Sequence, residues 1–274
     1  METRSRYPDR GHAFLREMHQ RHFWYRGRRR FALAAPRCVL AKQKRAHQSL
    51  DVADLGGGNG NWLAWLLQAG TPRIGRAVLA DVSPQALADA QAIVPGQVEK
   101  QQVDLCGPLP WHQAFDVVFL LDVIEHFRDD AALLERVRGV LRPGGLAVVT
   151  VPAFMSLWSW NDEEAGHFRR YRLGDLRALA NRSGLQPVLL RYFGWTLLPL
   201  YVPARWLLRP RSPEEMAAQA ARLHHVPPVW LNGLLSAAFC AETPLGVYLP
   251  LPWGTSALGI VRKPDETAHD ALST

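Results

Sequence analysis

A short apolar segment that runs directly into a cluster of glycines limits the folds open to this chain more than any other feature. The segment is Asp51-Val52-Ala53-Asp54-Leu55-Gly56-Gly57-Gly58-Asn59-Gly60, and an apolar stretch suited to a helix follows over 62–68. Glycine permits positive φ angles and lets a ligand approach the backbone closely. The N-terminus of the next helix adds unpaired N–H groups and a dipole that favours an anionic group. The sequence therefore predicts a strand, a tight turn and a helix that together bind a ligand.

Short apolar runs alternate with amphipathic stretches from Asp51 onward. This alternation is typical of a parallel sheet with helices on both faces, so we expect an α/β fold. A helix predicted over 130–141 ends at Arg142-Pro143-Gly144-Gly145, a breaker followed by turn glycines. The expected strands are 49–55, 76–81, 101–103, 115–121, 146–151, 186–192 and 256–261.

An acidic residue, Asp81, ends the second predicted strand about 25 residues after the glycines. A carboxylate at this position can accept hydrogen bonds from both hydroxyls of a ribose. Ser83 and Pro84 already supply the cap and first turn of the next helix, which leaves Asp81 free to bind. The glycines are spaced G-x-G-x-G, and Asn61 stands where a dinucleotide fingerprint has its third glycine, which disfavours a nicotinamide cofactor.

The order of these features resembles the class I S-adenosylmethionine-dependent methyltransferases of the small-molecule type over about 51–152. Gly57 departs from many relatives, which have cysteine or another small residue there. The parts that carry the resemblance are Asp54 to Gly60 as the first motif, Asp81 as the ribose-binding acid, Val103-Asp104-Leu105 as the turn that contacts adenine, Phe115 to Phe127 with Glu125-His126 as the fourth strand and active-site edge, and Leu141 to Gly145 as the turn before the fifth strand.

The resemblance implies a Rossmann-like sheet of seven mostly parallel strands, with helices on both faces and the last strand antiparallel. It divides the chain into an N-terminal helical lid (1–45), a cofactor-binding core (46–153), and a third part (154–274) with the acceptor-site loop, the last strands and an apolar helical cap inserted before the final strand. The implied cofactor is S-adenosylmethionine, and the product is S-adenosylhomocysteine. The expected cofactor contacts are Asp54, Gly56, Gly58, Gly60, Asp81, Val82, Asp104, Leu105, Leu121 and Arg26.

Two histidines are candidate catalytic bases. His126 follows the fourth predicted strand, and His167 lies in Gly166-His167-Phe168-Arg169-Arg170-Tyr171, where relatives frame the acceptor pocket. An unperturbed histidine titrates near pH 6.5, so either ring can take a proton from an acceptor hydroxyl. The alternative is that His126 holds the loop or packs beside the cofactor.

The three residues after Phe168 are predicted to bind the acceptor. Arg169 and Arg170 suit an anionic group, and Tyr171 precedes a helix expected over 173–183. The alternative interpretation makes the arginines solvated surface charges and Tyr171 a side chain that packs against the start of the helix.

A basic and aromatic cluster, His22 to Arg30, lies near the N-terminus. It resembles segments that fold over the cofactor as a lid in related enzymes, which would bring Arg26 to the methionine carboxylate. Such a run is otherwise a solvated face, or a surface that stacks on nucleic acid and contacts its phosphates. No recognisable RNA-binding appendage accompanies it, so nucleic acid is not the preferred partner.

The composition narrows the setting of the protein. A net charge of +7 and a pI near 9.7 favour anionic partners. The three cysteines lie far apart without a C-x-x-C pair, so neither a disulfide framework nor a cysteine zinc site is indicated, and nothing in the sequence requires a metal. The N-terminus lacks the apolar run of a secretory signal, which favours the cytoplasm.

The apolar stretch Trp195 to Leu208 is interrupted by Pro199, Pro203 and Arg205 and is shorter than the roughly 20 residues of a membrane-spanning helix. It predicts either a roof over the acceptor pocket or a peripheral contact with the inner face of a membrane. Both interpretations suit a hydrophobic acceptor.

Together these features predict methyl transfer to a small hydrophobic or anionic acceptor, with oxygen slightly preferred over carbon or nitrogen. Two alternatives stay open: an RNA methyltransferase, and a non-catalytic protein that keeps the fold and the cofactor.

Overall fold

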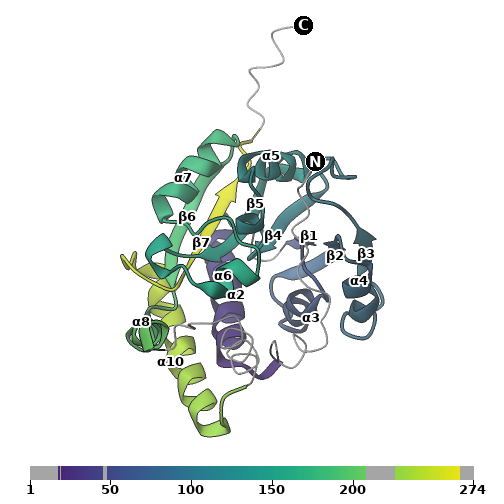
Figure 1. Cartoon of the computed structure of the whole chain (residues 1–274). Helices are drawn as coiled ribbons and strands as arrows, with labels where there is room; N and C mark the ends of the chain where they lie inside the picture. The colour runs from purple at the N-terminus through teal and green to yellow at the C-terminus, as the bar shows by residue number, and fades with distance from the viewer. Residues whose placement is uncertain (1–17, 19, 46–47, 208–225, 266–274) are drawn as a thin grey trace, which may run out of the picture.

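Seven strands form one sheet in the order β3-β2-β1-β4-β5-β7-β6 (Figure 1). The computed structural model describes residues 18, 20–45, 48–207 and 226–265. Neighbouring strands from β3 through β5 are parallel, and β7 runs antiparallel to both β5 and β6. The strands are β1 (Ser49–Leu55), β2 (Arg73–Asp81), β3 (Glu99–Gln102), β4 (Phe115–Leu121), β5 (Leu141–Pro152), β6 (Gln186–Phe193) and β7 (Ser256–Arg262).

The sheet confirms the predicted fold class, and most of the strand boundaries agree with the sequence. β1 and β4 begin and end at the predicted residues. The largest difference concerns β5, which starts at Leu141 and includes the segment predicted as a turn. Phe115 pairs with Leu141, and the pairing resumes at Val117 with Leu146. The residues between them bulge from the strand, with Gly144 at a φ of 73°, so the breaker residues distort β5 without ending it.

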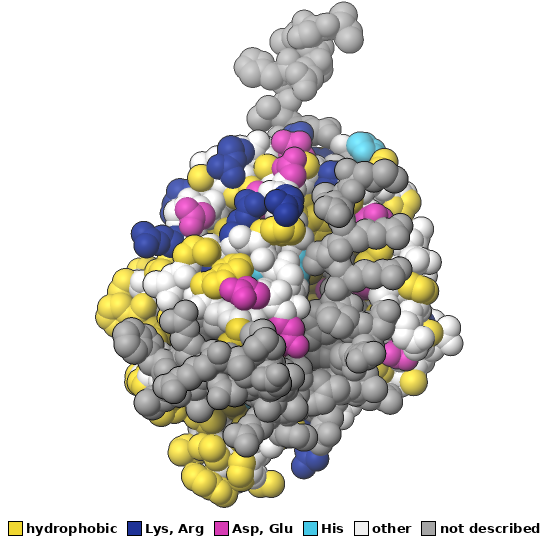
Figure 2. All heavy atoms as spheres, in the orientation of Figure 1, with side chains coloured by type: hydrophobic (Ala, Val, Ile, Leu, Met, Phe, Trp, Pro, Cys, Tyr) yellow, Lys and Arg dark blue, Asp and Glu magenta, His cyan; other side chains and the backbone are white. Residues whose placement is uncertain are grey.

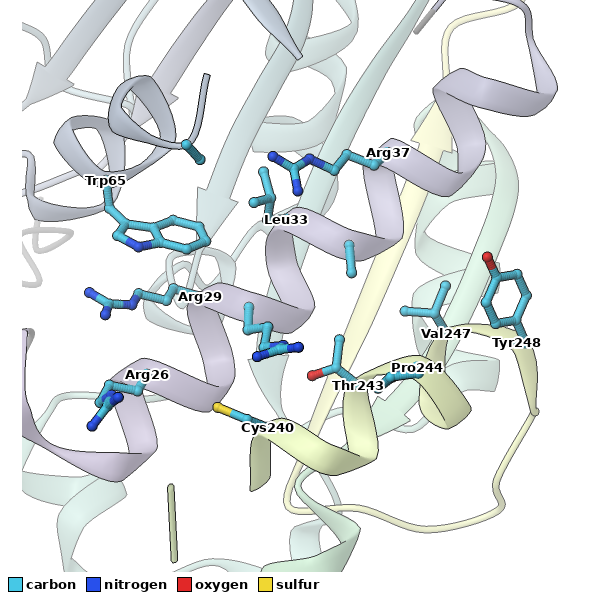
Figure 3. Close-up of a pocket in the computed structure, with 13 residues that line it drawn as sticks. Arg26, Arg29, Leu33, Arg37, Trp65, Cys240, Thr243, Pro244, Val247 and Tyr248 are labelled. Atoms are coloured by element: carbon cyan, nitrogen blue, oxygen red, sulfur yellow. The ribbon is translucent and has the colours of Figure 1, made fainter. Parts of the chain in front are cut away.

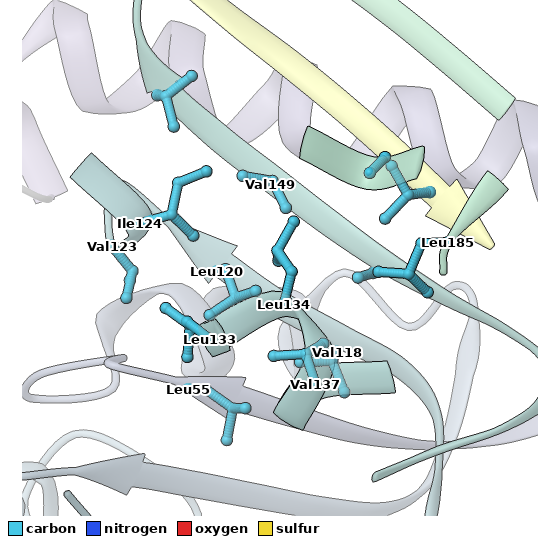
Figure 4. Packing of buried hydrophobic residues seen from close by; sticks show 14 of the residues in the cluster. Leu55, Val118, Leu120, Val123, Ile124, Leu133, Leu134, Val137, Val149 and Leu185 are labelled. Atoms are coloured by element: carbon cyan, nitrogen blue, oxygen red, sulfur yellow. The ribbon is translucent and has the colours of Figure 1, made fainter. Parts of the chain in front are cut away.

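Two hydrophobic clusters cover the two faces of the sheet, because successive side chains of a strand point to opposite sides. On β4, Val118 and Leu120 face helices α5 and α7 (Figure 4), whereas Val117 and Phe119 face α2, α3, α4 and α10. The helices are α2 (Phe23–Lys42), α3 (Asn61–Gln68), α4 (Pro84–Ala90), α5 (Asp130–Val140), α6 (Trp160–Glu164), α7 (Leu173–Arg182), α8 (Leu198–Leu207) and α10 (Val229–Tyr248), with 3-10 turns η2 (Ile124–His126), η3 (Met155–Leu157) and η4 (Trp195–Leu197).

The described part of the predicted N-terminal lid is mostly helix α2, and this helix belongs to the core. Its Phe31 is fully buried and stacks on Phe193 of β6, with ring centroids 4.9 Å apart. Leu40 is also buried in the same cluster. The described part of this segment therefore packs as a layer of the fold, and the lid over the cofactor stays a prediction.

Helix α10, in the predicted insertion before the last strand, packs closely against α2. Gly27 of α2 lies so close to Phe239 of α10 that a Cβ there would be 2.3 Å from the Phe239 ring. The side chain of Asn232 accepts a hydrogen bond from Phe23 N at 2.9 Å and donates one to Arg21 O at 2.8 Å. Helix α10 thus holds the N-terminal end of α2 in place.

The outer face of α10 is apolar and exposed, most of all at its N-terminal end (Figure 2). The exposed side chains include Val229 at 82%, Trp230 at 72% and Leu234 at 62%. Among the described helices, none combines the length and hydropathy needed to cross a membrane.

Candidate cofactor and acceptor site

The glycine turn after β1 has the backbone conformation that the sequence predicts. Gly56, Gly58 and Gly60 have φ angles of 72°, 56° and 75°. A Cβ at Gly56 would lie 2.9 Å from Val123, and one at Gly60 would lie 2.6 Å from Val94. A Cβ at Gly58 would meet nothing within 4 Å. Gly56 and Gly60 are thus required by packing, whereas Gly58 leaves open space in which a ligand can contact the backbone.

Asp81 joins this turn to the end of β2. Its Oδ2 accepts a hydrogen bond from Gly58 N at 2.8 Å, and its Oδ1 accepts one from Ser83 N at 2.9 Å. The Ser83 hydroxyl accepts a hydrogen bond from Ala86 N, so Ser83 caps α4 as predicted. A carboxylate oxygen has more than one lone pair, so Asp81 retains acceptor capacity for ribose hydroxyls.

The predicted adenine turn lies beside Asp81. Val103 N donates a hydrogen bond to Asp81 O at 3.0 Å. The exposed Asp104 accepts one from Cys106 N at 2.9 Å, while Leu105 is buried. Val82 exposes 41% of its surface at the end of β2. The turn therefore presents an acidic and an apolar residue next to an exposed aliphatic side chain, which suits a purine ring and its amino group.

Asp54 is buried directly beneath the glycine turn. Its Oδ2 has no hydrogen-bond partner among the described residues. Burial, and after it the nearby Asp81 carboxylate, raises the pKa of Asp54 to about 7, against the opposing effect of Arg28. A Cβ at Gly57 would lie 2.4 Å from Asp54 Oδ2, so this position, where relatives carry other small residues, needs glycine here. Asp54 can thus serve as the partner of a cationic ligand group.

An ion pair that sequence reasoning missed closes the other side of the site. Asp122 follows β4 with a φ of 58°, a left-handed conformation that is costly for a residue with a side chain. Its Oδ1 accepts a hydrogen bond from the Thr150 hydroxyl at 2.8 Å, and its Oδ2 pairs with Arg28 of α2. The left-handed backbone of Asp122 is visible in the structure and not in the sequence, which is why the sequence did not point to this pair.

Arg26 points away from this pair. Side chains two positions apart on a helix do not face each other, and Arg28 occupies the direction toward the sheet edge. Arg26 instead lines a cavity of about 630 Å³ between α2, α3 and α10 (Figure 3). Arg29 lies over the Trp65 ring in the same cavity, 5.2 Å from its centroid. The arginine of α2 at the candidate site is Arg28, which corrects the assignment of Arg26.

The two predicted histidines lie together. The rings of His126 and His167 pack edge to face, with centroids 4.7 Å apart. Burial, and after it the adjacent His167, lowers the pKa of His126 to about 4. Nδ1 of His167 lies 3.0 Å from Asp162 Oδ1. The tertiary fold therefore brings η2 and the loop after α6 to one point at the carboxyl ends of the strands.

Glu125 completes this group, which we call the Glu-His-His cluster (Glu125, His126 and His167). Glu125 is fully buried, and apart from its own backbone N–H no described residue donates a hydrogen bond to its carboxyl group. Burial raises its pKa well above the ordinary value, and Asp122 adds to the effect. The candidate ligand atoms of the three residues all lie within 4.8 Å of one another. Nothing in the sequence alone requires a metal, whereas these three side chains are donors of the type that binds one.

Two of the three predicted acceptor-binding residues are engaged inside the protein. Arg170 donates from Nε and Nη2 to the two oxygens of Asp162, at 2.8 and 2.9 Å, and its side chain is 5% exposed. The Tyr171 hydroxyl is 2.9 Å from Asp130 Oδ2, and Tyr171 is buried. These contacts make Arg170 and Tyr171 structural, because their polar groups are already satisfied away from solvent. Arg169 also bonds to Asp130 but keeps 37% of its side chain exposed.

Comparison with known proteins agrees with this geometry. A model of the methyltransferase domain family matches residues 14–190. The chain therefore belongs to the class I S-adenosylmethionine-dependent methyltransferases. No curated protein matches its sequence significantly.

Solved structures share the fold at low sequence identity. A methyltransferase in complex with the Haloferax volcanii activator Trm112 covers 98% of this chain and 100% of its own, at 18% identity and a TM-score of 0.61. The [4+2]-cyclase SpnF covers 86% and 80%, at 19% identity and a TM-score of 0.54. A sarcosine dimethylglycine methyltransferase from Galdieria sulphuraria covers 83% of each chain, at 16% identity and a TM-score of 0.53. At these identities the likeness concerns the fold alone.

Proposed function

We propose that this protein transfers the methyl group of S-adenosylmethionine to a small acceptor that is hydrophobic or anionic, with oxygen as the preferred atom. The observation that carries the proposal is the link between Gly58 and Asp81. It places an open stretch of backbone beside a carboxylate with free acceptor capacity, at the carboxyl ends of parallel strands where ligands of such sheets bind.

The cofactor contacts are proposed as follows. Asp81 accepts hydrogen bonds from the ribose hydroxyls, and Val82 contacts the adenine face. Asp104 and Leu105 contact the edge of the purine. The methionine end lies over the glycine turn near Asp54. The remaining proposed contacts are Gly56, Gly58, Gly60 and Leu121, with Arg28 taking the place first assigned to Arg26.

The sulfonium of the cofactor supplies an electrophilic methyl group, so the protein contributes mainly position. A carboxylate next to the ribose and a buried acid next to the methionine end fix the sulfonium relative to the carboxyl edge of β4. Asp122 is held there in one conformation by Thr150 and Arg28. The acceptor atom then has to approach in line from the side of the Glu-His-His cluster.

His126 fits poorly as a free general base. A base is most effective when its pKa lies near the working pH, and the pKa of His126 is lowered to about 4. His167 remains the better candidate, because Asp162 fixes its ring through Nδ1 and leaves the other nitrogen for an acceptor. Oxygen is preferred as the acceptor atom because a hydroxyl has a proton to give to such a group.

Apolar side chains around His167 support a hydrophobic acceptor. Met155, in η3, exposes 53% of its surface, and Phe168, in the loop between α6 and α7, exposes 38%. Arg128 lies over the Phe168 ring at 4.5 Å from its centroid, and Arg169 is half-exposed beside it. An acceptor with an apolar ring and a carboxylate or phosphate would satisfy both groups.

We propose a cytoplasmic location with a peripheral membrane contact through α10. The exposed Val229, Trp230 and Leu234 lie on the same helix that forms one wall of the arginine-lined cavity. An exposed apolar helix face next to arginines suits the surface of a membrane that contains anionic lipids.

Calorimetric titration with S-adenosylmethionine, S-adenosylhomocysteine and NAD tests the central claim. Binding of the two adenosyl ligands without NAD is expected, followed by transfer of labelled methyl to small acceptors in extracts and not to RNA. Labelled RNA would favour the RNA methyltransferase. Because the same fold occurs in a [4+2]-cyclase, binding without any transfer would favour a protein with another activity or none.

A further inference from the structure

Glu125 is a buried carboxyl group for which the proposed methyl transfer has no role. A buried carboxylate is costly unless hydrogen bonds or a cation compensate it. Glu125 is 0% exposed, and apart from its own backbone N–H no described residue donates a hydrogen bond to its carboxyl group. Arg28 acts on it as a cation but is already paired with Asp122. The carboxylate is therefore either protonated or compensated by a ligand.

Each of the two histidines beside Glu125 is held in place by a hydrogen bond outside the cluster. Nδ1 of His167 is hydrogen bonded to Asp162, whose other contacts come from Arg170 and from Ser159 N. His126 is hydrogen bonded to the backbone of Ala165. A histidine that binds a metal usually donates its second ring N–H to a carboxylate or a carbonyl, which fixes the ring. Both kinds of support are present here.

We propose that the Glu-His-His cluster binds a divalent transition-metal ion of the zinc type. Two imidazoles and one carboxylate form a donor set that zinc takes in catalytic sites, with the fourth position open. Magnesium prefers an all-oxygen shell and is a poorer match. The candidate donor atoms lie within 4.8 Å of one another, so small side-chain rotations bring all three to one ion.

The Asp162–Arg170 ion pair then also orients a metal ligand, in addition to stabilising the fold. Arg170 holds Asp162 in one orientation through two hydrogen bonds, and Asp162 in turn holds the ring of His167. The segment first assigned to acceptor binding thus serves the cluster through one buried ion pair. With a metal bound, the free ring nitrogen of His167 is a ligand and no longer a base, and the metal would instead make an acceptor hydroxyl more acidic. That role rests on the proposed function, whereas metal binding itself does not.

The test uses the full chain without an affinity tag, stripped with a chelator and titrated with zinc, with bound metal counted by mass spectrometry. One equivalent is expected. Glu125→Gln and His167→Ala should each weaken zinc binding at least tenfold. His112→Ala, which removes an exposed histidine outside the cluster, should stay within twofold of the wild type. Cobalt in place of zinc should give a visible spectrum that His167→Ala changes.

Binding of S-adenosylhomocysteine by the same variants shows that they are folded, because its contacts lie on the other side of Asp122. The metal site is wrong if the wild type binds no stoichiometric zinc. It is also wrong if the folded Glu125→Gln and His167→Ala variants bind zinc as tightly as the wild type. If zinc binds as expected and S-adenosylhomocysteine does not bind to the wild type, the metal site stands and the proposed function fails.

Discussion

The carboxylate of Asp81 accepts a hydrogen bond from the backbone of Gly58 at 2.8 Å, which joins the turn after β1 to the end of the neighbouring strand β2 beneath the proposed cofactor. One residue therefore does two things: it fixes the glycine turn and offers its remaining lone pairs to a ribose. This double role sets the expected effect of removing it.

Asp81→Ala should lower the affinity for S-adenosylmethionine by about 1.5–3 kcal/mol, or roughly tenfold to a hundredfold, because a charge-assisted hydrogen bond is lost. Calorimetry of the variant measures this directly. Asp89→Ala, on the outer side of the next helix, is the matched control and should bind normally. Equal affinity of Asp81→Ala and the wild type would remove the ribose assignment.

The glycine turn allows packing and ligand binding to be separated. Gly56→Ala should destabilise the protein strongly, because its Cβ would lie 2.9 Å from Val123 in addition to the positive φ. Gly58→Ala has free space and should lose only about 1 kcal/mol from its positive φ. Its Cβ nevertheless lies where the cofactor approaches, so affinity should fall more than stability. Thermal unfolding and calorimetry on both variants give the comparison, and a Gly58→Ala protein with unchanged affinity would contradict it.

The buried pair of Arg170 and Asp162 predicts a stability effect. Arg170→Ala should reduce the free energy of unfolding by about 3–5 kcal/mol, because it removes the guanidinium that pairs with both oxygens of a buried carboxylate. Arg169→Ala breaks a half-exposed pair and should cost about 1 kcal/mol or less. Urea unfolding measures both. If Arg170→Ala unfolds like the wild type while binding of an acceptor weakens, Arg170 belongs to the acceptor site after all.

Asp54 predicts a pH dependence of stability. Its folded pKa of about 7 lies above the ordinary 3.8, so the folded state binds the proton more tightly than the unfolded state between these values. Stability should therefore fall as pH rises from about 4 to 7 and level off above 7, by on the order of 1.4 kcal/mol for each pKa unit of difference. Asp54→Asn should remove this part of the slope in urea unfolding at a series of pH values. An unchanged slope would show that Asp54 is ionised in the folded protein.

The exposed end of α10 predicts binding to anionic vesicles. Trp230→Ser combined with Leu234→Ser should reduce cosedimentation with vesicles that contain phosphatidylserine, because exposed apolar area is lost. Val188→Ser removes an exposed apolar side chain on β6 and serves as the control. No binding by the wild type, or equal loss in the control, would leave α10 without a membrane role.

The sequence predicted the parts of the molecule that depend on neighbours along the chain. The glycine turn, the cap at Ser83 and the limits of β4 follow from local apolar runs and turn residues. The seven strands and the antiparallel last strand followed from the family resemblance, whose motifs are local in the same sense. These features are visible in one sequence because each is formed within a few residues.

The contacts that shape the site were not predictable in this way. Whether Arg26 or Arg28 faces the sheet depends on how α2 is rotated, and the burial of Phe31 sets that rotation. Arg170 looks like a surface charge until Asp162 is folded onto it. Glu125 was read as part of a motif, and only the tertiary structure shows that it is buried beside two histidines with no hydrogen bond from another described residue.

The contact between Gly27 and Phe239 also affects the candidate site, because it joins α2 to α10. The match to the methyltransferase domain ends at residue 190, so α10 lies outside the part of the chain that defines the family. Yet α10 holds the start of α2, and α2 carries the arginine that restrains Asp122. A fragment that stops at residue 190 would contain every motif of the family and still lose the geometry of its own active-site edge.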